Sequence, residues 1–249
     1  MNSVNIDSHA HLYDSYNTHT WCEAALSNLG SGGIVVVVDR AGQDSCARLA
    51  KEVPAFATWS ELPASMGGVV SWANGQTIIV VRGVQYVASE RIEVLGLGVG
   101  RQCDDREGAE ALLKLIKTAG GVACLPWSPG KWLGKRGGVV QGLLERSSPH
   151  DFVVGDIALR STVGPYSLLL ARAKRRGYSV VCGSDPLPRS QDQSLVGSFG
   201  MRIIGTAPTA PSERVRWALA RLLSGEGISA CGQRNGVLEA AARFLSAIR

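Results

Sequence analysis

The sequence predicts an α/β fold, a distorted (β/α)7-8 TIM-like barrel that forms a single domain over residues 1–249. Short β-branched runs alternate with amphipathic helical patterns about seven or eight times along the chain. The runs are apolar almost throughout, as expected when helices cover both faces of a parallel sheet. A length of 249 residues with 45% hydrophobic content suits one large core, and no linker-like change in composition divides the chain.

The expected strands are short runs rich in Val, Ile and Leu. The first is VNID at residues 4–7, and GIVVVV at 33–38 is the most continuous. The same character recurs at residues 77–81, 91–99, 121–125, 151–159, 178–183 and 201–204. Only the stretch from 77 to 98 breaks the alternation with helices, because the link between its two runs is too short to hold one. We therefore expect these two runs to be neighbouring strands.

Four segments carry the clearest helical patterns. In residues 106–121, one face is apolar, Glu and Lys take the other, and a Gly pair ends the segment; the apolar face comprises Ala109, Leu112, Leu113 and Ile116. Residues 165–177 and 211–227 begin at Pro and end at Gly, as helices commonly do. A last helix is expected at 235–248, with an apolar stripe of Val237, Leu238, Ala241, Phe244, Leu245 and Ile248. An open, doubly wound sheet is the alternative arrangement of the same elements.

Composition restricts the classes of partner and compartment. The formal net charge is +5, but Lys and Arg are spread along the chain with one dense cluster at residues 174–176. This spread argues against a nucleic-acid partner and suits a small anionic substrate. Six isolated cysteines without a CxxC pair favour reduced thiols in a cytoplasmic protein, and we expect neither an export signal nor a membrane span. The oligomeric state is not predicted.

Polar side chains follow the expected strands, where a barrel of this kind places its reactive residues. His9 and His11 come directly after the first strand, so both imidazoles point to one side and can reach one cation. Asp185, after the strand at 178–183, could complete the site. Two hydrogen-bonded imidazoles in a polar barrel mouth are the alternative. The other polar residues at strand ends are Asp7, Asp39, Arg40, Gln85, Glu93, Lys131, Asp156, Arg160 and Ser184.

Four segments together resemble the PHP family (polymerase and histidinol phosphatase), metal-dependent phosphoesterases on a distorted seven-stranded barrel. IDSHAHLYDS at 6–15 resembles the family's opening D-x-H-x-H motif, and GIVVVVDRAG at 33–42 is similar to its second motif. RGVQYVASERIEVLGLG at 82–98 resembles its third strand pair, and CGSDPL at 182–187 its closing motif. Amidohydrolases and TatD-like deoxyribonucleases share the HxH start more distantly, and VGDIALRS at 154–161 is similar to a TatD strand, with Asp156 in place of Glu.

The resemblance implies His9, His11 and Asp185 as metal ligands and also shows which ligands the chain lacks. Where the family usually has His, Glu, His, His and His, this sequence has Arg40, Gln85, Glu93, Leu125 and Leu187. The chain has four histidines, and the other two, His19 and His150, lie outside any expected strand end. The family's trinuclear cluster therefore cannot form here.

A reduced, mononuclear site remains chemically sensible. Arg cannot coordinate a metal and repels a nearby cation, and Gln offers one neutral oxygen in place of a bridging carboxylate. A single Zn or Mn ion held by two His and one Asp leaves an open position for water. We therefore expect a metal-dependent hydrolase of a phosphate ester. Its expected catalytic residues are Glu93, as a fourth ligand or general base, and Arg40 and Arg160, as cations for the substrate.

The opposing hypothesis is a catalytically inactive PHP-like barrel that binds an anionic ligand or a protein partner. In that case the guanidinium of Arg40 would replace the charge of the ion and would pair with Asp39, Asp185 or Glu93. The contacts of Arg40 therefore discriminate between the two hypotheses. The cations Lys131, Lys135 and Arg136 are expected in a solvated loop, with a phosphate cradle as the alternative.

Overall fold

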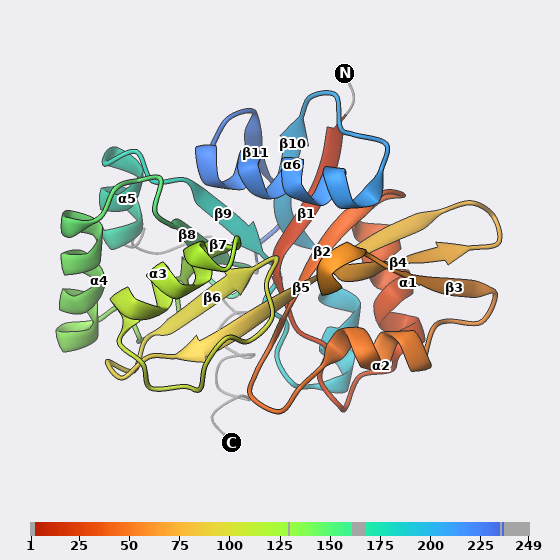
Figure 1. The fold of residues 1–249 in the computed structure, drawn as a ribbon, viewed down its shortest axis with the longest axis horizontal. Coiled ribbons are helices and arrows are strands. Elements are labelled where there is room, and N and C mark those ends of the chain that lie inside the picture. Colours follow the sequence, from red (N-terminus) through yellow and green to blue (C-terminus); the bar gives the residue numbers. More distant parts are fainter. Residues whose placement is uncertain (1–2, 129, 161–167, 235, 237–249) are drawn as a thin grey trace.

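One long mixed sheet organises the molecule (Figure 1). The computed structural model describes residues 3–128, 130–160, 168–234 and 236. In this part of the chain eleven strands join in the order β11-β10-β1-β2-β5-β6-β7-β8-β9, and a hairpin of β3 and β4 pairs with β5. The strands are β1 (Ser3–Ala10), β2 (Gly33–Asp39), β3 (Ala57–Glu61), β4 (Gly67–Trp72), β5 (Thr77–Val87), β6 (Glu93–Leu97), β7 (Val122–Pro126), β8 (Val153–Ile157), β9 (Val180–Gly183), β10 (Phe199–Ile204) and β11 (Ile228–Gly232).

β6 interrupts the parallel arrangement of the sheet. β1, β2 and β5 are parallel neighbours, and so are β7, β8 and β9. β6 runs antiparallel to both β5 and β7. It is antiparallel to β5 because the five residues between the two strands leave no room for a helical crossover. The expected pair of neighbouring strands within residues 77–98 is confirmed.

The barrel closes where β9 comes alongside β1. The hydroxyl of Ser8 donates to the carbonyl of Cys182 at 2.8 Å, and the N–H of Asp185 donates to the carbonyl of His9 at 2.8 Å. Gly183 permits this approach, because a Cβ at that position would lie 2.4 Å from the Cβ of His9 and 2.6 Å from its backbone nitrogen. The fold is therefore a nearly closed barrel, as predicted, and not an open doubly wound sheet.

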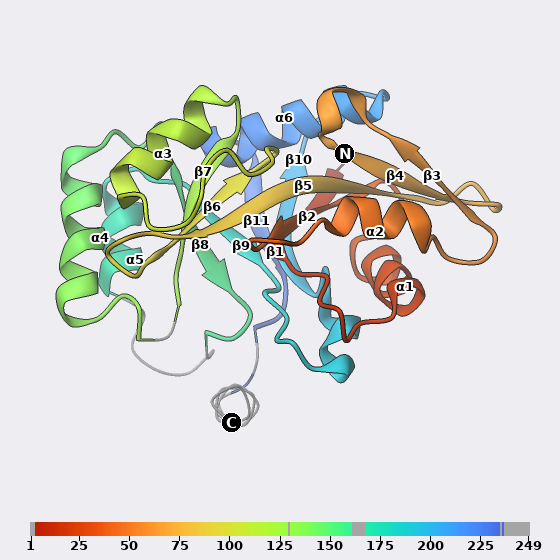
Figure 2. The ribbon, with the colours of Figure 1, turned by 60° about the horizontal axis from the view of Figure 1, so that its bottom comes forward.

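Helices cover the outside of the sheet in two groups (Figure 2). α3, α4 and α5 pack over β6, β7 and β8, whereas α1 and α2 pack over β2 and β5. The apolar face of α6 packs into a separate buried cluster, which is formed by the strand residues that face the inside of the barrel. Their bounds are α1 (Thr18–Leu29), α2 (Ser45–Lys51), α3 (Ala109–Thr118), α4 (Gly134–Arg146), α5 (Leu168–Arg175) and α6 (Pro211–Ser224), with short 3-10 turns at η1 (Pro63–Ser65) and η2 (Ser190–Leu195).

The GIVVVV run is buried on both of its faces, as the sequence predicts. Ile34 and Val36 belong to the cluster inside the barrel. Val35 and Val37 face outward and belong to the cluster beneath α1, which includes Trp21. Each fully buried side chain of this kind stabilises the fold by about 1.5 to 3 kcal/mol. The end of β2, which carries Asp39 and leads to Arg40, is held in place by this packing.

Two helix predictions are confirmed, although both helices are shorter than the expected segments 106–121 and 211–227. In α3, the four residues of the expected apolar stripe are all buried. α6 begins at Pro211 and ends at Ser224, and Gly225 follows as its C-cap with a left-handed φ of 75°. For the segment 165–177, α5 confirms a helix from Leu168, and residues 165–167 lie outside the described residues. The helix expected at 235–248 also lies outside them.

Other elements were not predicted from the sequence pattern. α4 contains three glycines after its first residue within GKRGGVVQGLLER, which weakens its helical signal, and β3 and β4 are short strands with few apolar residues. The strand expected at 151–159 is shorter in the structure and spans Val153–Ile157. None of the described helices combines the length and apolar character that a membrane crossing requires.

Candidate metal site

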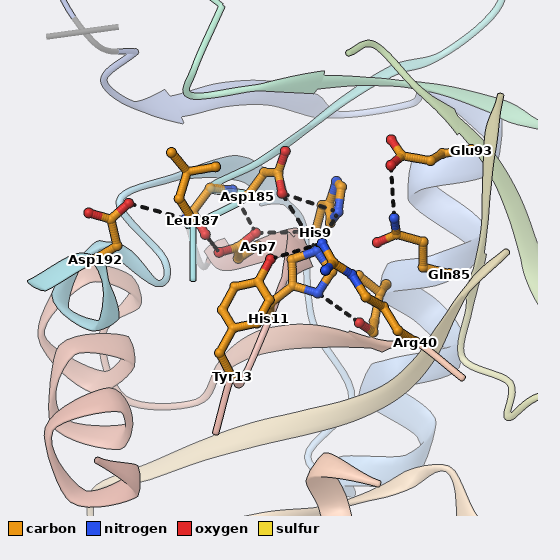
Figure 3. Close-up of polar contacts among 12 residues, drawn as sticks. Asp7, His9, His11, Tyr13, Arg40, Gln85, Glu93, Asp185, Leu187 and Asp192 are labelled. Carbon is orange, nitrogen blue, oxygen red and sulfur yellow. Dashed lines mark hydrogen bonds and ion pairs between the residues drawn. The ribbon is translucent and has the colours of Figure 1, made fainter. Parts of the chain in front are cut away.

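The end of β1 places two histidines on one side of the strand. His9 and His11 alternate with Ala10, and 5% and 2% of their surfaces are exposed. Their Nε2 atoms lie 3.3 Å apart (Figure 3). The spacing of two residues on an extended segment therefore brings both imidazoles to one point, as predicted.

Asp185 reaches the two histidines from the loop after β9. Its Oδ1 lies 3.6 Å from Nε2 of His9 and 3.6 Å from Nε2 of His11. The φ of Asp185 is 41°, a left-handed backbone that Asp adopts more readily than most residues. Among the residues that the structure describes, these three form the one group of His, Cys, Asp or Glu suited to a metal ion, with all ligand atoms within 4.8 Å of one another.

The separations of these donor atoms fit one tetrahedral ion. Donors at about 2.0 to 2.2 Å from a tetrahedral zinc lie about 3.3 to 3.6 Å from one another. His11 Nδ1 lies 2.9 Å from the carbonyl of Val38, so Nδ1 carries the proton and the Nε2 lone pair faces the site. His9 Nδ1 is buried and finds no hydrogen-bond partner among the described residues. The residues present can therefore hold one ion, with the orientation of His11 fixed better than that of His9.

Burial keeps both imidazoles neutral near pH 7. It lowers the pKa of His9 to about 4, with Glu93 opposing this shift and Arg40 and Lys131 adding to it. Burial also lowers the pKa of His11 well below its usual range, and the neighbouring His9 and Arg40 act in the same direction. A neutral imidazole offers its lone pair to a metal without first losing a proton. Asp185 is then the negatively charged member of the group.

Asp7, the acidic residue of DSHAH, supports the site through backbone contacts. It is fully buried and accepts hydrogen bonds from the N–H of His9 at 3.1 Å, the N–H and hydroxyl of Ser184 at 3.0 and 2.5 Å, and the N–H of Gly197 at 2.8 Å. Burial raises the pKa of Asp7 to about 6, although these hydrogen bonds oppose the shift. Asp7 therefore ties β1 to the loop that carries Asp185.

The opposite side of the barrel mouth holds a chain of polar contacts between β5, β6 and the loop after β7. The side-chain amide of Gln85 donates to Glu93 Oε1 at 2.9 Å, and the ammonium of Lys131 forms an ion pair with the same oxygen. Glu93 is 15% exposed, and Figure 3 shows it with Gln85 on the far side of His9 from Tyr13. The expectation that Lys131 is merely solvated is wrong, because its charge is used in this pair.

Arg40 lies beside the histidines and contacts Tyr13. Its Nη2 donates to the hydroxyl of Tyr13 at 3.2 Å, and its guanidinium lies 5.3 Å from the centre of that ring. The Tyr13 ring in turn lies 5.0 Å from the ring of His11. Arg40 forms no ion pair within 4.0 Å with any residue in the described part of the chain, whereas Asp39 accepts hydrogen bonds from Ser45. The pairs expected for an Arg40 that replaces the ion are therefore not observed.

Arg160 is not brought to the histidines by any contact that the structure shows. Its Nε and Nη2 donate to the two oxygens of Asp156, each at 2.6 Å, and both residues are more than nine-tenths buried. A role of Arg160 toward a substrate stays a prediction.

Two positions at which the resembled family has His are occupied by leucines with structural roles. Leu125 is buried in the cluster beneath α3 and α4. The carbonyl of Leu187 accepts a hydrogen bond from the hydroxyl of Tyr16 at 2.5 Å, and its N–H donates to Asp192 at 3.1 Å. Sequence reasoning missed the contributions of Tyr13, Tyr16 and Asp192. Tyr13 lies within the segment IDSHAHLYDS but is not one of the motif's D-x-H-x-H residues, and Tyr16 and Asp192 lie outside the recognised motifs.

Comparison with known proteins shows a similarity of fold alone. No protein-family model and no curated protein matches the sequence. The chain superimposes over 100% of its length on 99% of PsfC from Pseudomonas syringae PB-5123, with a TM-score of 0.60 and 13% identity. It matches 70% of a two-domain protein from Bacteroides vulgatus ATCC 8482 that contains a predicted PHP-like metal-dependent phosphoesterase, over 98% of its own length, with a TM-score of 0.50 and 9% identity.

A third similar structure is the lesion-specific endonuclease PfuEndoQ from Pyrococcus furiosus. The chain covers 66% of that protein with 98% of its own length, at a TM-score of 0.52 and 12% identity. At these identities the similarity establishes the barrel fold alone. The fold predicted from the sequence is confirmed by these structures.

Proposed function

We propose that the chain is a divergent PHP-like metal-dependent hydrolase that holds one Zn or Mn ion at His9, His11 and Asp185 and acts on a phosphate ester. The observation that supports this proposal is the convergence of three donor atoms at separations of 3.3, 3.6 and 3.6 Å. The fold shared with a protein described as containing a PHP-like metal-dependent phosphoesterase supports the reaction class.

Residues of the chain itself would supply the other interactions with the substrate. A bound ion supplies positive charge that polarises a phosphoryl oxygen and makes water more acidic. Arg40, beside His11, and Lys131, paired with Glu93, carry positive charge at the barrel mouth and would attract the other phosphoryl oxygens. Tyr13 orients Arg40, and burial raises the pKa of Tyr13, so the phenol keeps its proton. Glu93 orients Lys131 through their ion pair, and its use as a fourth ligand or base stays a prediction.

The contacts of Arg40 favour this proposal over an inactive barrel. A guanidinium that replaces the ion should pair with Asp185 or Glu93, but Arg40 donates to Tyr13 and Glu93 pairs with Lys131. The proposal includes a small anionic substrate, a single domain over residues 1–249 and a cytoplasmic location, which the six free thiols support.

Metal analysis of protein purified without chelator tests the proposal. We expect about one ion per chain, and added Zn or Mn should stabilise the fold by about 2.7 kcal/mol at a hundred times its Kd. His9→Ala should remove both the ion and the hydrolysis of an aryl phosphate. The matched control is His150→Ala, since His150 is exposed and outside the site.

Two results would contradict the proposal. One is less than about a tenth of an ion per chain together with no thermal shift on adding Zn or Mn. The other is retained phosphatase activity in His9→Ala, which would show that the ligands lie elsewhere.

A further inference from the structure

The phenol of Tyr13 has a hydroxyl proton that no group in the described part of the chain accepts. The hydroxyl oxygen accepts a hydrogen bond from Nη2 of Arg40 at 3.2 Å, and among the described residues the hydroxyl makes no other hydrogen bond. A guanidinium can only donate, so the phenol keeps its own O–H for another partner. Tyr13 is buried, with 7% of its surface exposed. Since buried polar groups are normally hydrogen-bonded, the acceptor of this proton is water or a bound molecule.

The hydroxyl of Tyr13 points toward the candidate metal site. Figure 3 shows the hydroxyl end of the side chain directed toward His11 and Asp185, with the backbone end of Tyr13 on the opposite side of its ring. The centre of the ring lies 5.0 Å from the centre of the His11 ring, and the two planes make an angle of 34°. A molecule that accepts the proton of Tyr13 would therefore lie next to the histidines and to the guanidinium of Arg40.

Contacts with His11, Tyr16 and Arg48 hold Tyr13 in this position. The ring of Tyr16 meets the ring of Tyr13 edge-on, with the centres 5.3 Å apart. The N–H of Tyr16 donates to the carbonyl of Tyr13 at 2.9 Å. The guanidinium of Arg48, in α2, donates to the carbonyl of Tyr13 at 2.9 Å and to that of Tyr16 at 2.7 Å. A donor that is held in place before the reaction needs no reorganisation when charge develops beside it.

The groups around Tyr13 are open to solvent and so to a substrate. Arg40 is exposed, and the side chain of Asp185 is 21% exposed. Because Arg40 contacts the hydroxyl of Tyr13 directly, a phosphoryl oxygen that binds this guanidinium comes within reach of the phenol as well. The guanidinium then supplies positive charge, whereas the phenol supplies one directed hydrogen bond.

We propose that Tyr13 is a catalytic residue whose phenol donates a hydrogen bond to a phosphoryl oxygen of the substrate. In this role the phenol transfers no proton and forms no covalent bond, and it stabilises the negative charge that develops on that oxygen. The inference rests on the proposed hydrolase activity. It adds a contact with the substrate to the contact by which Tyr13 orients Arg40.

A double-mutant cycle of Tyr13→Phe and Arg40→Met separates the two contacts of Tyr13. Hydrolysis of an aryl phosphate is measured with the Zn-loaded protein. If the phenol contacts the substrate, Tyr13→Phe lowers kcat/KM about 10-fold or more, both in the wild type and in the Arg40→Met background. If Tyr13 acts only by orienting Arg40, Tyr13→Phe has no effect once Arg40 is replaced, and the proposal is wrong. The Phe ring keeps the packing against His11 and Tyr16, so the Kd for Zn should not change.

Tyr178→Phe is the matched control for the loss of a buried phenol. Tyr178 precedes β9, at the end of that strand opposite to Asp185, and its hydroxyl donates to the carbonyls of Leu144 and Ser147 at 3.2 and 2.8 Å. We expect this variant to be less stable than the wild type and to keep its kcat/KM. If Tyr178→Phe lowered kcat/KM as much as Tyr13→Phe, a general loss of stability would explain both effects, and the catalytic role would be rejected.

Binding of inorganic phosphate gives a measurement that does not depend on turnover. In Zn-loaded protein labelled with 13C at the tyrosine Cζ atoms, the NMR signal of Tyr13 is the one that is absent from Tyr13→Phe. We expect added phosphate to shift this signal in the wild type and in Arg40→Met, because the phenol donates to the ligand in both. A signal that does not move, or that moves only while Arg40 is present, would overturn the proposal.

The failure of this inference and the failure of the proposed function give different results. If the Zn-loaded wild type hydrolysed no phosphate ester, the proposed function would fall and the role of Tyr13 with it. If Tyr13→Phe hydrolysed the aryl phosphate as fast as the wild type, the role of Tyr13 alone would fall, and the hydrolase would stand.

Discussion

The β1 and β9 side of the barrel mouth carries donors that point at one another, whereas the β5 and β6 side carries groups that neutralise one another. On the first side, two neutral imidazoles and Asp185 converge on one point. On the second, the negative charge of Glu93 is paired with Lys131. A cation gains from the first arrangement and little from the second. This difference explains why one ion is proposed here in place of several.

The second side also keeps positive charge at the site without a second ion. Lys131 and Arg40 both lower the pKa of His9, so each lies within electrostatic reach of it. Fixed cations of this kind can bind phosphoryl oxygens but cannot make water more acidic by coordination. The barrel mouth therefore combines one place for coordination chemistry with two places for charge alone.

The largest effect on stability and metal binding is expected from Gly183→Ala, which should force β9 away from β1 and so disturb the first side. The added Cβ would lie 2.4 Å from the Cβ of His9, so either the strands separate or the backbone shifts. We expect a loss of about 3 kcal/mol in the free energy of unfolding, measured by urea denaturation, together with weaker metal binding.

Gly138→Ala is the control for this change. Gly138 lies in α4, and no atom lies within 4 Å of the place that an added methyl group would take, so Ala should stabilise the helix by about 0.5 to 1 kcal/mol. If Gly183→Ala were as stable as the wild type and bound metal normally, the close approach of β9 would not be what builds the first side.

Residues of both sides were expected at strand ends, but only the convergence of the first side was predictable from the sequence, and the pairing on the second side was not. His9 and His11 share a side because a strand alternates its side chains, and Asp185 follows the strand that closes the barrel, so local spacing and strand order are sufficient. The pair of Glu93 and Lys131 joins a strand to a loop 38 residues later, and its geometry depends on loop conformation, which periodicity does not determine.

The contact between Arg40 and Tyr13 is also beyond what a pattern can predict. The two residues are 27 positions apart in the sequence, and only the folded chain brings them together. Tyr13 was therefore absent from the residues expected at the site. The fold itself was predicted more fully. The hydrophobic periodicity of strands and helices recurs along the whole chain, whereas each site motif occurs once.

The same chemical change on each side should have unequal effects on metal binding. Asp185→Asn removes the charge of the proposed carboxylate ligand while keeping its shape, and we expect the Kd for Zn to rise more than about 100-fold. Glu93→Gln removes a charge that already has a partner, so the Kd should rise about 10-fold or less. Competition with a chromophoric chelator measures both values. Equal losses would show that Glu93 is itself a ligand, and the contrast between the two sides would fail.

The smallest effect, and the one that most sharpens the comparison, is expected from the double change Gln85→Glu with Lys131→Met. It replaces a neutral amide by a carboxylate and removes the cation that neutralises Glu93, so the second side gains negative charge facing the site. Attraction at this range should lower the Kd for Mn about 10-fold. Lys135→Met controls for loss of a loop cation, since Lys135 is exposed at the start of α4. If the double variant bound Mn no better than the wild type, the paired charges of the second side would not be what limits metal binding there.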